Sequence, residues 1–255
     1  MASLFSLQRK LLFLLLIGLS FTDNFAQSFE NSQLQYTRVR TAKNDKEYKL
    51  RQKFEARGLP YPPTEVYFRA FKKEGVLEIW VKGWDGRFKK FDDYTSCASS
   101  GDLGPKRRQG DEQVPEGFYY INKFNPQSNY YLSLGIDYPN QADRINSHSG
   151  NLGGSIYIHG SCKTIGCIPL TNEGIKEVYL LAVKAKNSGQ GNIPIHIFPF
   201  KFNNILYAQK EKDKRSYDYP LLRFWENLKQ GYDYFENNKV VPRVSVNSDG
   251  SYAFY

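Results

Sequence analysis

Cysteine, histidine and methionine are all scarce in this chain. Its 255 residues include three cysteines, three histidines and one methionine. Three cysteines are too few for a disulfide-rich scaffold, and because the number is odd, at least one thiol must stay unpaired. The chain has no CxxC pair and no second pair of metal ligands, so a zinc site is not favoured. Metal binding by Cys162, Cys167 and His159 is the structural alternative.

The chain also lacks long apolar segments, apart from one at its N-terminus. Arg9 and Lys10 precede an apolar run over residues 11–19, which is too short to span a bilayer comfortably. This order of basic, apolar and then small residues predicts a secretory signal peptide over residues 1–26, cleaved after Ala26. We therefore expect an exported protein of the periplasm or cell envelope, with an uncleaved membrane anchor as the alternative.

Acidic residues are fewer than basic ones, 26 against 35, which gives a formal net charge of +9. A solvated basic surface or an anionic partner would explain this excess. We expect no nucleic acid as a partner, because the chain has neither zinc-finger spacing nor an RNP-like aromatic stretch. An anionic polymer of the cell envelope agrees better with export.

The overall composition is that of a globular protein. Apolar residues make up 40% of the chain and aromatic residues 16%, which is enough for a large core and too apolar for disorder. The abundant Tyr and Phe residues favour strands. We therefore expect a mainly β fold with a few helices.

Changes in composition divide the chain into segments. Residues 27–63 form a polar leader, in which 48–57 is predicted to be a short helix and the proline-rich segment 58–63 a linker. A catalytic domain is expected over residues 64–200. A C-terminal extension that packs on this domain is expected over residues 201–255.

Short aromatic and β-branched runs predict the strands of the domain. Residues 66–71 and 76–81 are separated by a turn-forming segment, so a hairpin is expected. Two prolines indicate that the strand over 193–200 lies at an edge of its sheet. Further strands are expected over 118–121 and 130–134, and through Phe88 and Phe91.

Helical spacing is clearest over residues 172–185, where one apolar stripe runs along the segment. A second helix, with an aromatic face, is predicted over 219–235. We expect this face to pack in the core, with the wall of a substrate groove as the alternative. The charge run over 210–215 is predicted to be a solvated loop, and 240–246 a last short strand.

The stretch over residues 155–170 contains the residues best suited to catalysis. The β-prone residues before His159 predict a strand that ends at this histidine, and small residues lead from it to Cys167. A Cys–His pair is the minimum for thiol nucleophilic catalysis, because the imidazole takes the thiol proton and the thiolate attacks a carbonyl.

Two cysteines are candidates for the nucleophile. Cys162 lies three residues after His159 and Cys167 eight residues after it, so either could reach the imidazole, and a structural cysteine is also open. Gly166 precedes Cys167, and a glycine beside a nucleophile exposes backbone N–H groups that could hold an oxyanion. A Cys97–Cys162 disulfide would leave Cys167 free, whereas a Cys162–Cys167 disulfide would silence the site.

The remaining motifs have simpler explanations. His148 lies in a polar loop, where a solvated side chain is expected. His196 lies inside an apolar strand, and we expect it in the core or at an edge. The glycine-rich segment 150–154 is followed by neither a Walker-type lysine nor a helix, so we expect a flexible turn there.

Residues 159–167 resemble the catalytic signature of the L,D-transpeptidase (YkuD-type) family. The signature has a His-Gly pair, a [Ser/Thr]-x-Gly-Cys segment and then an apolar residue, and this chain has these at 159–160 and 164–168. The compact form His-Gly-x-Cys-x-[Ser/Thr]-x-Gly-Cys is especially similar to the YafK-like branch. The similarity extends over about residues 64–240 and includes segments 104–106, 110–111, 115–119, 153–156 and 224–232.

The resemblance implies a YkuD-like β-sandwich or barrel domain with a Cys–His site for peptidoglycan. By this resemblance Cys167 is the nucleophile and His159 is its base. The backbone around Gly166 and Cys167 would hold the oxyanion, and Thr164 and Gly160 would shape the loop. The cysteine would form a thioester with a diaminopimelate-containing stem peptide. No metal or organic cofactor is implied, and we expect a monomer.

The second substrate stays open. An amine acceptor would give L,D-transpeptidation, which is the first hypothesis. Pro169 stands where many transpeptidases of the wider family have an arginine, and the His–Cys loop is shorter than usual. Hydrolysis of the diaminopimelate–lysine link between peptidoglycan and an attached lipoprotein, an activity associated with the YafK-like branch, is therefore the second hypothesis. A non-catalytic peptidoglycan-binding protein is the third.

Overall fold

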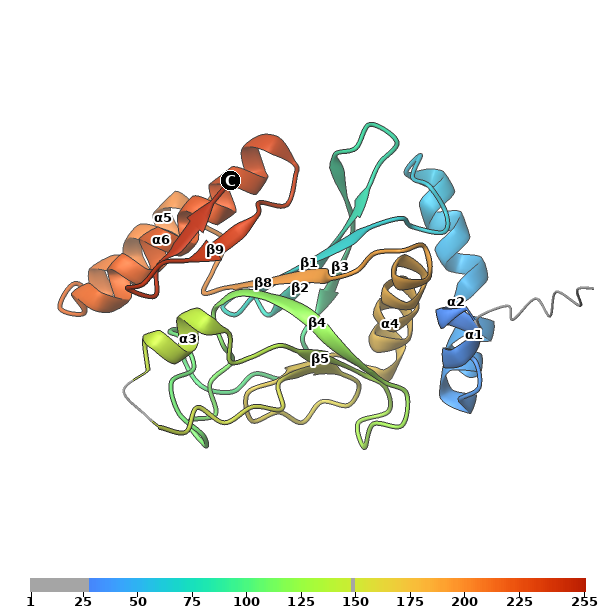
Figure 1. The fold of residues 1–255 in the computed structure, drawn as a ribbon, viewed down its shortest axis with the longest axis horizontal. Helices are drawn as coiled ribbons and strands as arrows, with labels where there is room; N and C mark the ends of the chain where they lie inside the picture. The colour runs from blue at the N-terminus through green and yellow to red at the C-terminus, as the bar shows by residue number, and fades with distance from the viewer. Residues whose placement is uncertain (1–27, 148–149) are drawn as a thin grey trace, which may run out of the picture.

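The computed structural model describes residues 28–147 and 150–255 (Figure 1). Its centre is one eight-stranded sheet in the order β3-β2-β1-β8-β4-β5-β6-β7. The predicted signal peptide and His148 lie outside the described residues. The strands of this sheet are β1 (Val66–Phe71), β2 (Val76–Lys82), β3 (Phe88–Thr95), β4 (Gly117–Asn125), β5 (Ser133–Ile136), β6 (Tyr157–His159), β7 (Ile168–Pro169) and β8 (Ile193–Phe198).

Six helices and a small second sheet complete the described part of the chain. The prediction of a mainly β domain with few helices, followed by a helical C-terminal region, is confirmed. The helices are α1 (Phe29–Gln33), α2 (Thr37–Ala56), α3 (Gln141–Ile145), α4 (Asn172–Asn187), α5 (Ile205–Lys214) and α6 (Tyr219–Asn238), and the second sheet pairs β9 (Val244–Val246) with β10 (Tyr252–Phe254).

The predicted hairpin forms from β1 and β2, which pair antiparallel with Phe71 opposite Val76. Side chains from the two faces of β1 pack in different hydrophobic cores. Phe68 and Ala70 belong to the core beneath α4, whereas Phe71 belongs to a second core with residues of α6. This explains why every residue of β1 is buried, since both faces of the strand are covered.

Strand β8 corrects the expectation of an edge strand. It lies inside the sheet, parallel to β1 on one side and antiparallel to β4 on the other. Pro194 is tolerated because pairing with β1 begins only at Ile195, so the missing N–H of the proline leaves no gap in that ladder. His196 is in the core, as one of the two alternatives predicted, and its Nδ1 lies 2.6 Å from the Tyr67 hydroxyl.

The predicted helix α4 packs on one face of the sheet and begins where its cap residue allows. The Thr171 hydroxyl accepts a hydrogen bond from the Gly174 N–H at 3.1 Å. Helices α1 and α2 lie outside α4, on its far side from the sheet (Figure 1). Helix α2 is twice as long as the helix predicted for the leader, because its first half is charged and is held by ion pairs such as Lys46–Glu173.

The charge run over 210–215 is not the solvated loop that was predicted, because most of it lies in helix α5. The buried Glu211 accepts from Arg215 and lies 3.4 Å from Lys214, which are helical i,i+4 and i,i+3 spacings. The aromatic helix α6 forms as predicted, and its Trp225 is fully buried. The predicted last strand forms as β9, and β10 was not anticipated.

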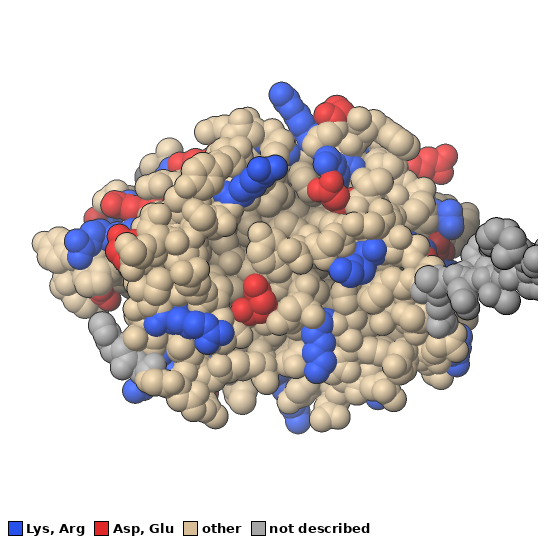
Figure 2. Space-filling model, viewed as in Figure 1, with Lys and Arg blue, Asp and Glu red and all other residues tan. Residues whose placement is uncertain are grey.

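Basic residues are dispersed on the surface shown in Figure 2, where uncharged residues and some Asp and Glu side chains separate them. This face therefore carries no continuous cationic stripe of the kind that binds nucleic acid. Among the helices of residues 28–147 and 150–255, none is both long and apolar enough to cross a membrane.

Candidate active site

The pairing of β6 with β7 brings the predicted histidine and cysteine to one place. The two strands run parallel, with Ile158 opposite Ile168 and His159 opposite Pro169. The Leu170 N–H also donates to the His159 carbonyl at 2.7 Å. Cys167 directly precedes β7, so this register sets it beside the end of β6. The residues between the two strands form a short connecting loop, the β6–β7 loop (residues 160–167).

His159 is held in one tautomer. Its ring is 2% exposed, and Nδ1 lies 2.6 Å from the Gly160 carbonyl oxygen. Because a carbonyl can only accept, Nδ1 carries the proton and Nε2 keeps its lone pair. The Tyr130 ring packs against the imidazole with a centroid separation of 4.6 Å. Burial lowers the pKa of His159 below its ordinary value, so the ring is neutral and basic at neutral pH.

Cys167 is the one free cysteine and is partly buried. Its Sγ donates a hydrogen bond to the Ser155 carbonyl oxygen at 3.6 Å. Among residues 28–147 and 150–255, no hydrogen bond links Sγ to the His159 imidazole. Burial raises the pKa of the Cys167 thiol, and the positive charge of Lys106 offsets this only in part. The resting pair is therefore a neutral thiol with a neutral imidazole. Reaction requires a rotation of the thiol towards Nε2 and transfer of its proton.

Thr164 orders the backbone next to the nucleophile. Its Oγ1 accepts from the N–H groups of Gly166 at 3.2 Å and Cys167 at 2.9 Å, and it donates to the Cys167 carbonyl at 2.9 Å. These two N–H groups are the donors that were predicted for an oxyanion. In this arrangement Thr164 already occupies both, so an oxyanion bound there would have to replace the hydroxyl as acceptor.

Two glycines fit the β6–β7 loop for steric reasons. A Cβ on Gly160 would lie 2.7 Å from Asn172 Oδ1 and 2.9 Å from the Tyr130 carbonyl oxygen. Gly166 has φ of +127°, which other residues rarely adopt, and its Cβ would lie 2.9 Å from the Gln113 carbonyl oxygen. Both positions bring the loop close to neighbouring backbone.

A disulfide joins Cys97 to Cys162, with their Cα atoms 5.3 Å apart. This is the pairing that leaves Cys167 free, one of the two considered from the sequence. The segment around Cys97 is itself fixed to β7, because the Cys97 N–H and the Ser96 hydroxyl both donate to the Pro169 carbonyl, at 3.1 and 3.0 Å. The middle of the β6–β7 loop is thus attached to a segment that β7 already holds.

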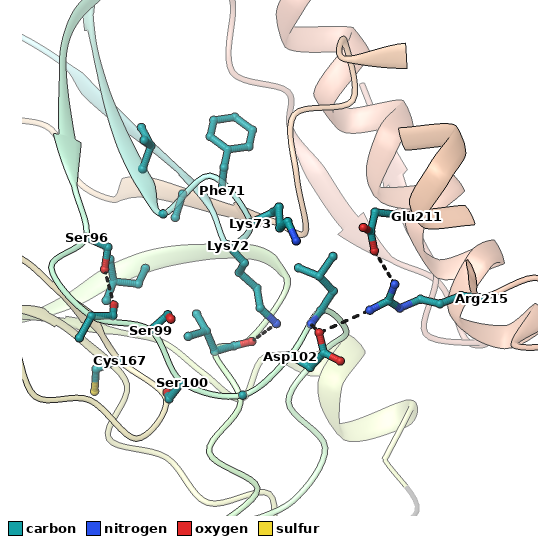
Figure 3. Close-up of a pocket in the computed structure, with 18 of the residues that line it drawn as sticks. Phe71, Lys72, Lys73, Ser96, Ser99, Ser100, Asp102, Cys167, Glu211 and Arg215 are labelled. Carbon is teal, nitrogen blue, oxygen red and sulfur yellow. Dashed lines mark hydrogen bonds and ion pairs between the residues drawn. The ribbon is translucent and has the colours of Figure 1, made fainter. Parts of the chain in front are cut away.

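Cys167 lines two cavities. One, of about 500 Å³, is the histidine cavity, which is lined by His159, Tyr130, Ser155 and Thr164 among others. The other, of about 440 Å³, is the distal cleft, which lies between the loop over residues 96–103 and helix α5 (Figure 3). No group of three or more His, Cys, Asp or Glu side chains among residues 28–147 and 150–255 is placed to hold a metal ion.

The comparison with known families agrees with this geometry. A model of the L,D-transpeptidase catalytic domain, YkuD, matches residues 65–197. This chain belongs to the L,D-transpeptidase family. The match includes His159, Cys167 and all eight strands of the main sheet except the last residue of β8, and it ends before α5.

The chain is similar to other proteins in sequence and in structure. The chain is 40% identical over 185 residues to "Putative L,D-transpeptidase YafK" of Escherichia coli K12, which covers 72% of this chain and 71% of that protein. The crystal structure of the helical cell shape determining protein Pgp2 from Campylobacter jejuni has a TM-score of 0.43 and 20% identity, over 74% of this chain and 75% of that one. Bd1075 of Bdellovibrio bacteriovorus has a TM-score of 0.39 and 21% identity, over 71% and 62%.

The candidate site also contains residues that the sequence did not indicate. Tyr130 was assigned to a strand, but strand β5 begins at Ser133, and Tyr130 instead contacts the His159 ring. Ser155 supplies the carbonyl that accepts from the thiol. No local sequence pattern marks either residue. Tyr130 reaches the site because β5, which follows it, pairs with β6, and Ser155 reaches it through the loop before β6.

Proposed function

We propose that this protein is a cysteine-dependent enzyme of the L,D-transpeptidase type, acting on peptidoglycan stem peptides through a thioester on Cys167. One observation carries the proposal. In a chain of this family, the free thiol of Cys167 and the unprotonated Nε2 side of His159 meet at one cavity, with the tautomer fixed by the Gly160 carbonyl. This is the arrangement that a general base and a thiol nucleophile need.

The first half-reaction forms the thioester. Nε2 of His159 takes the thiol proton, Sγ bonds to the carbonyl carbon of the donor peptide, and the amide C–N bond breaks. The proton on Nε2 passes to the departing nitrogen, which leaves as an amine. Backbone N–H groups at Gly166 and Cys167 stabilise the oxyanion once it replaces the Thr164 hydroxyl as their acceptor.

The second half-reaction releases the acyl group. An amine acceptor gives up a proton to Nε2 and bonds to the thioester carbon, and the C–S bond breaks to restore the thiol. This gives a new amide, which is transpeptidation. Because its pKa is lowered, His159 is neutral and ready to act as the base in both halves at neutral pH.

Amide hydrolysis is the second candidate, with water in place of the amine. The observation that favours it is Pro169, which is buried in β7 and offers no cation at the position two residues after the nucleophile. A diaminopimelate–lysine link between peptidoglycan and a lipoprotein is the substrate for this reaction. The lysine side chain would then leave as the amine.

Mass spectrometry distinguishes the two reactions. The purified protein and its Cys167→Ala variant are incubated with defined tetrapeptide muropeptides and with a diaminopimelate–lysine linked peptide. A cross-linked or amine-exchanged product that is absent with the variant supports transpeptidation, and released lysine peptide supports hydrolysis. If both substrates are unchanged while the variant binds peptidoglycan as well as the wild type, the protein is a binding protein instead.

We also propose that the protein acts outside the cytoplasm, after export directed by residues 1–26. The Cys97–Cys162 disulfide supports this, because such bonds persist in oxidising compartments. Expression of the full chain in cells, followed by fractionation and by sequencing of the mature N-terminus, tests it. A mature chain that begins at Gln27 in the envelope fraction is expected, and an intact Met1 in the cytoplasm would contradict export.

A further inference from the structure

The distal cleft is built by three parts of the chain that lie far apart in sequence. They are the end of β1 with the turn to β2, the loop over residues 96–103, and helix α5. Figure 3 shows side chains of all three facing one another, with Cys167 on the far wall from α5. The charged residues that line the cleft are Lys72, Lys73, Asp102, Glu211, Lys214 and Arg215.

The chemistry of the thioester assigns the two cavities that Cys167 lines to different parts of the substrate. His159 must give its proton to the departing amine, so the leaving group lies in the histidine cavity. The amine or water that follows must lose its proton to the same nitrogen and therefore enters from that side too. The acyl group, which stays attached to Sγ meanwhile, has to lie elsewhere. The distal cleft is the other cavity that Cys167 lines.

A positive excess along this cleft suits the acyl donor that was proposed. Diaminopimelate has two carboxyl groups, so when one is the carbon bound to Sγ the other remains as a carboxylate. Lys214 is 56% exposed and lies 3.4 Å from Glu211, whereas Arg215 is held by Glu211 at 2.5 Å and by Asp102 at 3.4 Å. The contact of Lys214 is long, so a carboxylate entering the cleft can come closer to its ammonium group than Glu211 does.

Lys72 is a different kind of cation. It is buried, lies 3.0 Å from Glu116, and donates to the carbonyls of Gly104 and Val114 at 2.6 and 2.9 Å. Burial lowers its pKa. Its contacts hold the floor of the cleft together, so it is not assigned to the ligand.

Ser100 supplies an independent sign of a ligand. Its hydroxyl oxygen lines the cleft, is buried, and has no hydrogen-bond partner in the structure. A buried hydroxyl without a partner destabilises a fold, and at the wall of a cleft a bound ligand can supply the missing partner. A carboxylate or amide oxygen of a bound peptide would accept its proton.

We propose that the distal cleft binds the acyl-donor peptide, and that Ser100 and Lys214 recognise the second carboxylate of its diaminopimelate residue. The inference rests on the proposed function, which it deepens. It gives α5 a role in specificity, although this helix lies beyond the matched catalytic domain at 65–197. Arg215 is held by Glu211 and joins α5 to the loop at Asp102, so it is not assigned to the ligand, and Lys214 and Ser100 are the positions to test.

The test measures acylation of Cys167 by intact-protein mass spectrometry with two tetrapeptide stems. The stems differ only in whether the second carboxyl of diaminopimelate is free or amidated. The proteins are the wild type, Lys214→Gln, Ser100→Ala and the control Lys212→Gln. Lys212 lies on the same helix but pairs with Glu226 and does not line the cleft.

With the free carboxylate, Lys214→Gln and Ser100→Ala should acylate about three- to tenfold more slowly at low substrate concentration, as expected for one partly exposed charged contact or one hydrogen bond. With the amidated peptide, Lys214→Gln should match the wild type because the negative charge is gone, whereas Ser100→Ala should still be slower because the amide oxygen accepts the same hydrogen bond. Lys212→Gln should match the wild type with both peptides. Ser100→Ala should also unfold at the same temperature as the wild type or a higher one, since it removes an unpaired buried hydroxyl.

Two outcomes overturn the inference while the proposed function stands. One is an equal loss in Lys214→Gln with the free and the amidated peptide, and the other is a loss in Lys212→Gln as large as that in Lys214→Gln. If neither peptide acylates the wild type, the proposed function fails. Calorimetry of both peptides binding to Cys167→Ala then tests the cleft separately. Tighter binding of the free carboxylate that is lost on adding Lys214→Gln supports carboxylate recognition in the distal cleft, and equal binding of the two peptides refutes it.

Discussion

The Cys97–Cys162 disulfide allows a prediction whose magnitude follows from the structure. The perturbation is the double replacement Cys97→Ser with Cys162→Ser. The bond holds the middle of the β6–β7 loop, which joins His159 to the nucleophile and carries Thr164. Cys162 is exposed, so the replacement leaves no cavity in the core and tests the cross-link itself.

The expected loss of stability comes from the length of chain that the bond closes. The two cysteines are 65 residues apart in sequence. The chain-entropy model gives about 4 kcal/mol for a loop of this length, and measured values usually run from about 2 to 4 kcal/mol. For a chain of this size each kcal/mol lowers the melting temperature by about 2–4 °C, so a fall of about 5–15 °C is expected.

The assay is thermal and urea unfolding of the oxidised wild type, the double variant and Cys167→Ser. Cys167→Ser keeps the disulfide and should unfold close to the wild type, so it controls for cysteine replacement as such. The double variant should also form the Cys167 thioester more slowly, because the β6–β7 loop that orders the Cys167 N–H loses an anchor. Wild-type melting in the double variant would refute the reasoning, as would an equal loss in Cys167→Ser.

Three further predictions concern the nucleophile and its loop. The rate at which iodoacetamide alkylates Cys167 should have a pH midpoint above that of free cysteine, because burial raises the pKa of the thiol. His159→Gln should leave this midpoint unchanged while abolishing turnover. A midpoint of about 4–6 would instead reveal a preformed thiolate–imidazolium ion pair. Thr164→Val should lower kcat by about tenfold or more, because the hydroxyl that orders the backbone of Gly166 and Cys167 is lost, and Thr164→Ser should restore kcat. Equal losses in the two variants by steady-state kinetics would show that the role of Thr164 is steric. Gly166→Ala should lower the free energy of unfolding by about 1–3 kcal/mol, since φ is +127° and the new Cβ meets the Gln113 carbonyl, whereas urea unfolding like the wild type would show that the loop adjusts.

Local patterns were sufficient for elements whose partners are close in sequence. The β1–β2 hairpin formed where two apolar runs flank a turn, and α4 began after Thr171, whose hydroxyl caps it. Both depend on hydrogen bonds that span a few residues, so the sequence nearby contains the necessary information. The aromatic helix α6 followed its own periodicity in the same way.

Long-range packing decided the elements that local patterns misjudged. The prolines of β8 suggested an edge, but β8 lies between β1 and β4 because pairing with β1 starts after Pro194. The charges of α5 suggested a solvated loop, but Glu211 is buried with Arg215 and Lys214 around it. The partners of β8 are far away in the sequence. Those of Glu211 are three and four residues away, and the feature that the charge run did not reveal is the burial of this carboxylate.

The sequence by itself determined the family and the candidate pair His159 and Cys167, with a glycine directly before the cysteine, because these depend on residue types at fixed short spacing. The tertiary structure decided which cysteine pairs with Cys97, which ring nitrogen of His159 is free, and that Cys167 faces two cavities. The physical reason is that these properties arise from strand register and from contacts across tens of residues. The residues of one short segment do not show which distant residues it will contact.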